Sequence, residues 1–111
     1  MKTHSMNLQP APFTKIKSGK KSIELRLYDE KRRQIQAGDE ILFTQTESGE
    51  MLRAKVIALY PFASFRELYS ALPLEKCGYA AGERALPEDM RAYYSAEDEL
   101  KWGVVGIEIQ I

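Results

Sequence analysis

The sequence has very little of the chemistry needed for metal binding, disulfide formation or membrane insertion. Its 111 residues include one cysteine, Cys77, and one histidine, His4. A single cysteine has no disulfide partner within the chain, and one cysteine with one histidine cannot build the usual four-ligand zinc site. No apolar run approaches the roughly 20 residues that cross a bilayer. We therefore expect a cytoplasmic protein with no membrane partner, no metal and no cofactor.

The sequence also lacks an overall excess of charge, because 16 Lys and Arg residues balance 16 Asp and Glu residues. The charges are nevertheless segregated along the chain. Residues 15–33 hold eight basic and three acidic side chains, whereas residues 83–111 hold three basic and seven acidic ones. A basic cluster can hold phosphates through charge and counterion release. Alternatively, the two regions neutralise each other across the fold, and the composition leaves both open.

No internal repeat or glycine-serine linker divides the chain, and its length suits one hydrophobic core. We predict a single domain over residues 1–111, with residues 1–6 as a flexible lead-in. His4 falls in this lead-in and is therefore expected to be exposed to solvent.

Alternating apolar residues predict several strands. Ile23, Leu25 and Leu27 alternate with polar residues from Ser22 onward, as expected for a half-buried strand. Further strands are predicted at residues 40–44, 51–60 and 104–111. These strands, joined by short turns, favour a small barrel of the α+β or mainly β class, rich in antiparallel pairs.

Three or four short helices are predicted around this barrel. Prolines 10 and 12 open the first helix, and Gly19 follows where a left-handed cap is expected. Ser64 to Glu67 match a capping box ahead of a helix that ends near Ala71. Two more helical segments are predicted at residues 87–94 and 95–102.

The densest group of candidate binding residues lies in the segment from Gly19 to Arg26. The glycine delivers two lysines to a strand whose polar side carries Glu24 and Arg26. In a cleft, Lys20 and Lys21 would contact phosphate, and Arg26 would form a planar fork on phosphate or base. Glu24 would accept hydrogen bonds from an amine or act as a general base. On open surface, the same charges would form an ion pair of little energetic consequence.

The aromatic residues and the single cysteine are less specific candidates for a functional role. Tyr28 shares the polar side of the strand with Glu24, so it is the aromatic residue best placed to stack on an unpaired base. Trp102 is expected to pack against the barrel. Cys77 has no histidine or basic neighbour in the sequence and is expected to be an inert thiol.

Three segments near the amino end and one at the carboxyl end resemble those of a known family. They are Pro12-Phe13, Gly19-x-Lys21-x-x-Glu24-x-Arg26, Ala37-Gly38-Asp39-Glu40-Ile41-Leu42-Phe43, and Tyr94-Ser95-x-Glu97-x-Glu99-x-x-Trp102-Gly103-Val104-Val105-Gly106-Ile107-Glu108-Ile109. In this order, the segments resemble the ASCH-domain family, and the ending is similar to that of its small bacterial members. The resemblance covers most of the chain.

The resemblance implies a PUA-like β-barrel that handles RNA or modified bases, with Lys21, Glu24 and Arg26 lining its cleft. One branch of the family consists of acetylcytidine amidohydrolases, which use a lysine, a threonine and a later glutamate. The lysine falls on Lys21, but Glu24 stands at the position of the threonine, so the covalent route of that branch cannot be copied. Three residues are candidates for the later glutamate: Glu67, Glu75 and Glu97. Of these we choose Glu97. Some family members are also ribonucleases.

Our leading hypothesis is therefore a module that binds RNA or a modified nucleoside through Lys20, Lys21, Glu24, Arg26 and Tyr28. The alternatives are an amidohydrolase acting on an acylated nucleoside, or a ribonuclease, with Lys21, Glu24 and Glu97 as catalytic residues. A protein-interaction domain that keeps only the barrel is a third possibility. Both leading hypotheses require the side chains of one short strand to meet in a shared hollow.

Overall fold

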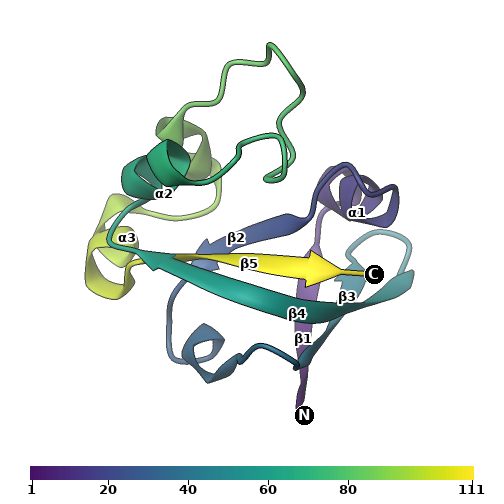
Figure 1. Cartoon of the computed structure of the whole chain (residues 1–111). Coiled ribbons are helices and arrows are strands. Elements are labelled where there is room, and N and C mark those ends of the chain that lie inside the picture. Colours follow the sequence, from purple (N-terminus) through teal and green to yellow (C-terminus); the bar gives the residue numbers. More distant parts are fainter.

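The computed structural model describes all 111 residues, which form a five-stranded mixed sheet curled into a half-barrel (Figure 1). The strand order is β1-β3-β4-β5-β2, so β1 and β2 are the two edges of the sheet. β1 pairs with β3 in parallel, and every other pair is antiparallel. The strands span Thr3–Leu8 (β1), Ile23–Leu27 (β2), Glu40–Gln45 (β3), Met51–Phe62 (β4) and Val104–Gln110 (β5).

Three short α-helices and two 3-10 helices decorate the sheet. They span Pro10–Lys17 (α1), Arg32–Gln34 (η1), Phe65–Ala71 (α2), Pro87–Ala92 (η2) and Ala96–Trp102 (α3). The side chains of Ser64 and Ser95 accept hydrogen bonds from backbone N–H groups in the first turns of α2 and α3, as the sequence predicts for N-caps. Gly19 has a φ of +82° and turns the chain after α1. The predicted α+β fold is thus confirmed.

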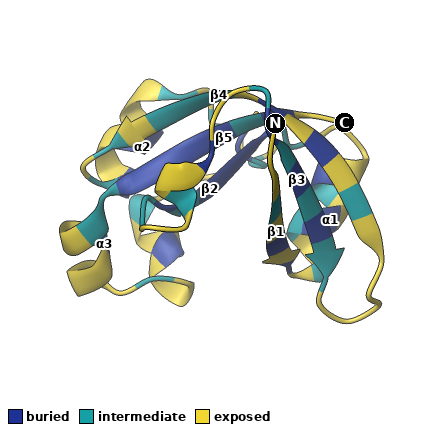
Figure 2. Cartoon of the chain, turned by 90° about the horizontal axis from the view of Figure 1, so that it is seen from below, coloured by how far each residue is buried: buried dark blue, intermediate teal, exposed yellow.

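Two apolar cores cover the two faces of the sheet. Figure 2 shows the buried residues as dark blue bands along the strands. Val105, Ile107 and Ile109 of β5 belong to the core inside the half-barrel, whereas Val104 packs with α2 and the later loops. The three leucine and isoleucine side chains of β2 join this second core. The charged residues of β2 therefore point to the opposite face from its apolar ones.

The predicted lead-in over residues 1–6 is wrong, because β1 begins at Thr3 and pairs with β3. Met6 and Leu8 are buried, and this alternation could have revealed the strand from the sequence. His4 is also not exposed as predicted. Its Nε2 lies 2.8 Å from Oδ2 of Asp39, and only 10% of its side chain is accessible.

Two other boundaries differ from the sequence prediction. β4 continues through Pro61 to Phe62, because this end of the strand pairs with β5 after its pairing with β3 has ended. The predicted helix at residues 87–94 is a 3-10 helix that ends at Ala92. None of the helices is long and apolar enough to span a membrane.

Candidate ligand-binding cleft

Three charged side chains of the segment after α1 form a buried ion-paired cluster. Lys21 Nζ lies 2.8 Å from Glu24 Oε1, and Arg26 Nε lies 2.8 Å from Glu24 Oε2. The turn at Gly19 brings the chain from α1 into β2, and it is held by the hydrogen bond from the Lys21 N–H to the Lys15 carbonyl. Each oxygen of the Glu24 carboxylate thus has its own cationic partner.

Glu24 is buried, with 4% of its surface exposed, yet it remains a carboxylate. Burial alone would raise the pKa of Glu24, but the charges and hydrogen bonds of Lys21 and Arg26 outweigh that effect and hold the pKa below its ordinary value. An ionised carboxylate with a lowered pKa is a good hydrogen-bond acceptor and a weak general base at neutral pH.

Arg26 also connects the two open edges of the sheet. Its Nη2 donates a hydrogen bond of 2.7 Å to the carbonyl oxygen of Asn7 in β1, while its Nε donates to Glu24. Part of the guanidinium is therefore committed to the protein itself. Arg26 therefore links β2 to β1 across the open side of the half-barrel, and only the remaining N–H groups of its guanidinium are available to a ligand.

The cluster borders a cavity of about 470 Å³ that lies at the free edge of β2. The end of β1 and the start of α1 form one wall, and residues from the loops between α2 and α3 form the other. The cavity has equal numbers of charges of each sign in its lining: Lys15, Lys21 and Arg26 against Glu24, Glu83 and Asp89. The acidic region folds over part of the basic one, so the cleft is of mixed charge without a basic excess.

A chain of hydroxyl groups lies on the wall opposite β2. The Tyr69 and Tyr79 hydroxyl oxygens are 2.7 Å apart, and the Tyr79 hydroxyl donates to Asp89 Oδ2 at 3.1 Å. Burial, together with the neighbouring Tyr69 and Asp89, raises the pKa of Tyr79 well above its ordinary value. Both phenols therefore stay protonated and available for hydrogen bonding.

Two further side chains of this wall have different surroundings. Tyr93 lines the cavity while 62% of its surface is exposed, so its ring is accessible at the mouth of the cleft. Cys77 also lines the cavity but is buried, and burial raises the pKa of its thiol to about 11. A thiol with that pKa is protonated at neutral pH and is a poor nucleophile.

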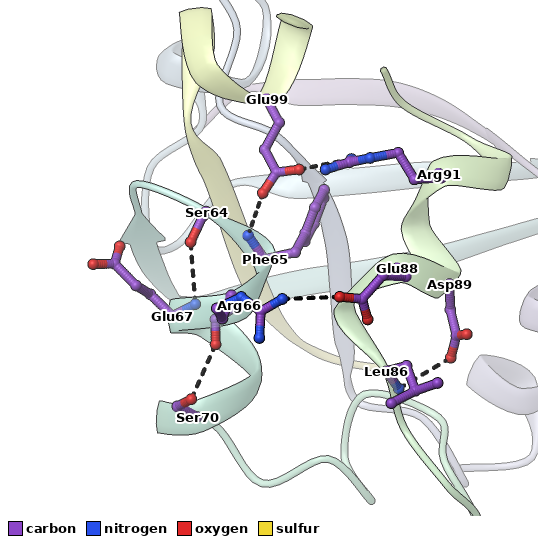
Figure 3. Close-up of polar contacts among 10 residues, drawn as sticks. All are labelled: Ser64, Phe65, Arg66, Glu67, Ser70, Leu86, Glu88, Asp89, Arg91 and Glu99. Atoms are coloured by element: carbon purple, nitrogen blue, oxygen red, sulfur yellow. Dashed lines mark hydrogen bonds and ion pairs between the residues drawn. The ribbon is translucent and has the colours of Figure 1, made fainter. Parts of the chain in front are cut away.

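The wall is held in place by Glu99, which sequence analysis named only as part of the carboxyl-terminal segment that resembles the ASCH-domain family. Its Oε2 accepts a 2.8 Å hydrogen bond from the Phe65 backbone N–H, and its Oε1 contacts Arg91 Nη1 at 2.8 Å (Figure 3). One carboxylate thereby joins α2, η2 and α3. Glu99 and Trp102 are three residues apart on α3, a spacing that places both on one helix face and could have indicated an inward role.

The structure brings Lys21, Glu24 and Arg26 together and leaves two other predicted binding residues outside the cavity lining. Lys20 is exposed beside Lys21. Tyr28 packs against the inner core, and the Arg33 guanidinium lies 4.4 Å from the centre of its ring. A base could not stack on that face of Tyr28 without displacing Arg33.

The three glutamates considered for a catalytic role also lie outside the cavity lining. Glu97 is exposed in the first turn of α3. Glu67 accepts a hydrogen bond from the backbone of Ala63 at the start of α2, and Glu75 is exposed in the following loop. The acidic residues that do reach the cleft are Glu24, Glu83 and Asp89, of which sequence analysis identified only the first.

No group of three or more His, Cys, Asp or Glu side chains is arranged to hold a metal ion. Sequence analysis did not identify Tyr69, Tyr79 or Asp89, which line the cavity from segments far from β2 along the chain. The pattern around the Gly19–Arg26 segment contains no signal for them.

Comparisons with known proteins agree on one family. The model of a family described as "ASCH domain" matches residues 6–111. No curated protein matches the chain. The crystal structure of the hypothetical protein PH0355 is 41% identical, and the match covers 99% of this chain and 98% of that one with a TM-score of 0.82.

Two further solved structures extend the comparison. The solution NMR structure of protein PF0455 from Pyrococcus furiosus is 42% identical, covers 97% of this chain and 96% of that one, and has a TM-score of 0.73. The crystal structure of ASCH from Zymomonas mobilis is 17% identical, with coverages of 98% and 67% and a TM-score of 0.66, so it shows likeness of fold alone.

Proposed function

This chain belongs to the ASCH domain family, and we propose that it binds single-stranded RNA by taking one nucleoside into the cleft beside β2. The family is PUA-like and is thought to bind RNA, which makes RNA the expected partner class. The observation that carries the proposal is the buried Lys21–Glu24–Arg26 cluster at the edge of a cavity of about 470 Å³.

The size and charge of the cavity favour a nucleobase over a phosphate group as the buried part of the ligand. Small-molecule sites commonly enclose roughly 300–1,000 Å³, a range that includes this cavity. Its charges balance, and its lining combines apolar surface with fixed donors and acceptors. Glu24 would accept a hydrogen bond from an exocyclic amine or ring N–H, and Lys21 would donate to a carbonyl oxygen.

Contacts outside the cavity would hold the remaining parts of the strand. Lys20 is exposed next to Lys21, so we assign it to a phosphate of the bound RNA. Tyr93 at the mouth of the cleft takes the stacking role that the sequence suggested for Tyr28. Stacking on an exposed aromatic ring is available to every base, so this contact would add affinity without selecting a sequence.

The cleft supports the amidohydrolase and ribonuclease alternatives less well. The pKa of Glu24 is lowered by its two cationic partners, which weakens it as the base that would activate water. None of the glutamates considered as the second catalytic group, Glu67, Glu75 and Glu97, lines the cavity. Of the two other acidic residues in the lining, Asp89 already accepts a hydrogen bond from Tyr79. Incubation with acetylcytidine should therefore release no acetate, and turnover that disappears in Glu24→Gln would favour the enzyme over the binding module.

Fluorescence anisotropy with labelled pentanucleotides of each base tests the proposal. Tyr93→Ala should weaken binding about five- to 150-fold, since one base–aromatic stacking contact is lost. Lys21→Ala should weaken it by at least about tenfold through loss of a charged donor. Lys55→Ala, an exposed lysine on β4 outside the cavity, is the matched control and should bind like the parent protein.

Because Lys21→Ala also removes a partner of buried Glu24, its folding should be checked by circular dichroism. Tyr93 is exposed, so its variant keeps the test valid even if Lys21→Ala unfolds. Absence of RNA binding by the parent protein, or equal affinity in the Tyr93→Ala and Lys55→Ala variants, would overturn the proposed function.

A further inference from the structure

One side of the β2 backbone has no neighbouring strand. The Ile109 N–H donates to the Ser22 carbonyl at 2.9 Å, and the Tyr28 N–H donates to the Gly103 carbonyl at 3.0 Å. The Ser22 C=O and the Tyr28 N–H therefore face β5, and alternation along an antiparallel pair assigns the same direction to the backbone groups of residues 24 and 26. The alternate residues of β2 consequently point their N–H and C=O groups toward the open edge. They are Ile23, Leu25 and Leu27.

These three residues differ in what lies beside their free backbone groups. The Ile23 N–H donates to the Lys76 carbonyl at 2.9 Å, so the following loop covers this part of the edge. No hydrogen bond from another part of the chain reaches the N–H or C=O of Leu25. Leu25 is only 7% exposed and lines the cavity, whereas Leu27 does not line it. The N–H and C=O of Leu25 therefore stand at the edge of the cavity without a partner from the chain, where a molecule that enters the cavity can hydrogen-bond to them.

We propose that the backbone of Leu25 reads the Watson–Crick edge of the base that enters the cleft, an inference that rests on the proposed function. In an extended residue, the N–H and C=O lie side by side and point in the same direction. They match a ligand that offers an acceptor directly next to a donor. The Watson–Crick edges of all four bases carry such a pair, so Leu25 N–H donates to the base while Leu25 C=O accepts from it.

The hydrogen-bonding groups of this edge do not suit two other classes of ligand, anions and an added peptide strand. A phosphate or carboxylate has only acceptors, so it would leave the Leu25 carbonyl without a donor. An added peptide strand would need several consecutive free residues, but the loop at Lys76 ends the free edge at Ile23. The side chains of Glu24 and Lys21 lie beside the same cavity and supply the further acceptor and donor that fix the base in one orientation.

Methylated oligonucleotides test which edge of the base is read. Each labelled pentanucleotide is compared with a counterpart whose bases carry a methyl group at N1 of the purines or N3 of the pyrimidines. We expect the tightest-binding sequence to lose at least about tenfold in affinity, because the methyl group blocks the contact and leaves Leu25 unpaired. The same pentanucleotide with a 2′-O-methyl ribose is the control and should bind within about threefold of the unmodified strand.

Replacement of the Leu25 amide by an ester tests the protein side of the contact. Incorporation of the α-hydroxy acid analogue of leucine removes the N–H and keeps the side chain. We expect about three- to tenfold weaker binding of the best pentanucleotide. The same replacement at Leu27 is the matched control, because its N–H faces the same open edge outside the cavity lining and should leave affinity unchanged.

The outcomes separate this inference from the proposed function. RNA binding that depends on Tyr93 but responds to neither the base methylation nor the Leu25 ester would overturn the backbone contact and leave the RNA-binding function standing. No binding of any pentanucleotide would overturn both. Equal losses from the Leu25 and Leu27 esters would show a general effect on β2 and would also overturn the contact.

Discussion

At the scale of single residues, Glu24 has two roles that depend on the same ion pairs. It holds Lys21 and Arg26 in place through two 2.8 Å contacts, and it presents an ionised carboxylate to the cleft. A buried carboxylate without cationic partners would be protonated instead. The same charges that make Glu24 available as an acceptor therefore make it necessary for folding.

Removal of the Glu24 side chain should destabilise the protein strongly. In Glu24→Ala two cations lose their buried partner, a change that typically costs about 3–5 kcal/mol. Urea unfolding measures the loss. Glu97→Ala, which alters an exposed carboxylate outside the cavity, should change the free energy of unfolding by less than about 0.5 kcal/mol and leave RNA affinity unchanged. Similar losses in the two variants would refute the importance assigned to the cluster.

Asp39 gives a residue-scale prediction about pH. Hydrogen bonds from His4 and from the backbone N–H groups of Gln36 and Lys2 lower the pKa of Asp39 from 3.8 to about 2. Because the pKa of Asp39 is lower in the folded state, its ionised carboxylate stabilises the folded protein above about pH 4, and this stabilisation is lost as the pH falls toward 2. Acid titration of the parent protein and of Asp39→Asn should show that this decline is smaller in the variant. Superimposable profiles in this pH range would contradict the assignment.

At the scale of elements, the strand that carries the cluster could be predicted and the wall that faces it could not. Alternation identifies β2, and side chains two apart on a strand share a face, so the proximity of Glu24 and Arg26 follows from their spacing. The placement of Tyr79 and Asp89 in the same cavity lining depends on how the segment between α2 and α3 folds back, and no local pattern encodes that path. β1 was missed because its buried Met6 and Leu8 lie in a polar terminal segment.

Glu99 is expected to hold the elements of this wall together. Glu99→Ala removes the acceptor of the Phe65 N–H and the partner of Arg91, which should cost about 1–3 kcal/mol. Amide hydrogen exchange over residues 86–94 should become faster in this variant. Asp98→Ala, an exposed neighbour in the same helix turn, should change stability by less than about 1 kcal/mol. Unchanged exchange in Glu99→Ala would show that the wall is held by other contacts.

At the scale of the whole molecule, the distribution of charge predicts weak salt dependence of RNA binding. The sequence suggests a basic, mixed-charge cleft, but folding places Glu83 and Asp89 in the same lining as Lys15 and Lys21, so the basic excess is lost. For single strands the logarithm of the affinity falls with that of the salt concentration by about 0.7 per phosphate neutralised. One or two phosphate contacts from exposed lysines should thus give a slope between about −0.7 and −1.4. A slope steeper than about −3 would indicate that phosphate contacts dominate.

An NMR titration of the ¹⁵N-labelled protein with the tightest-binding pentanucleotide tests most directly whether RNA enters the cleft beside β2. We expect the largest amide shifts at Leu25 and at the cavity-lining residues Gly78 and Tyr93, with little change at Leu27 or Lys55. Shifts concentrated away from the free edge of β2, for example along α3 or the exposed face of β4, would contradict the claim that this cleft is the RNA-binding site.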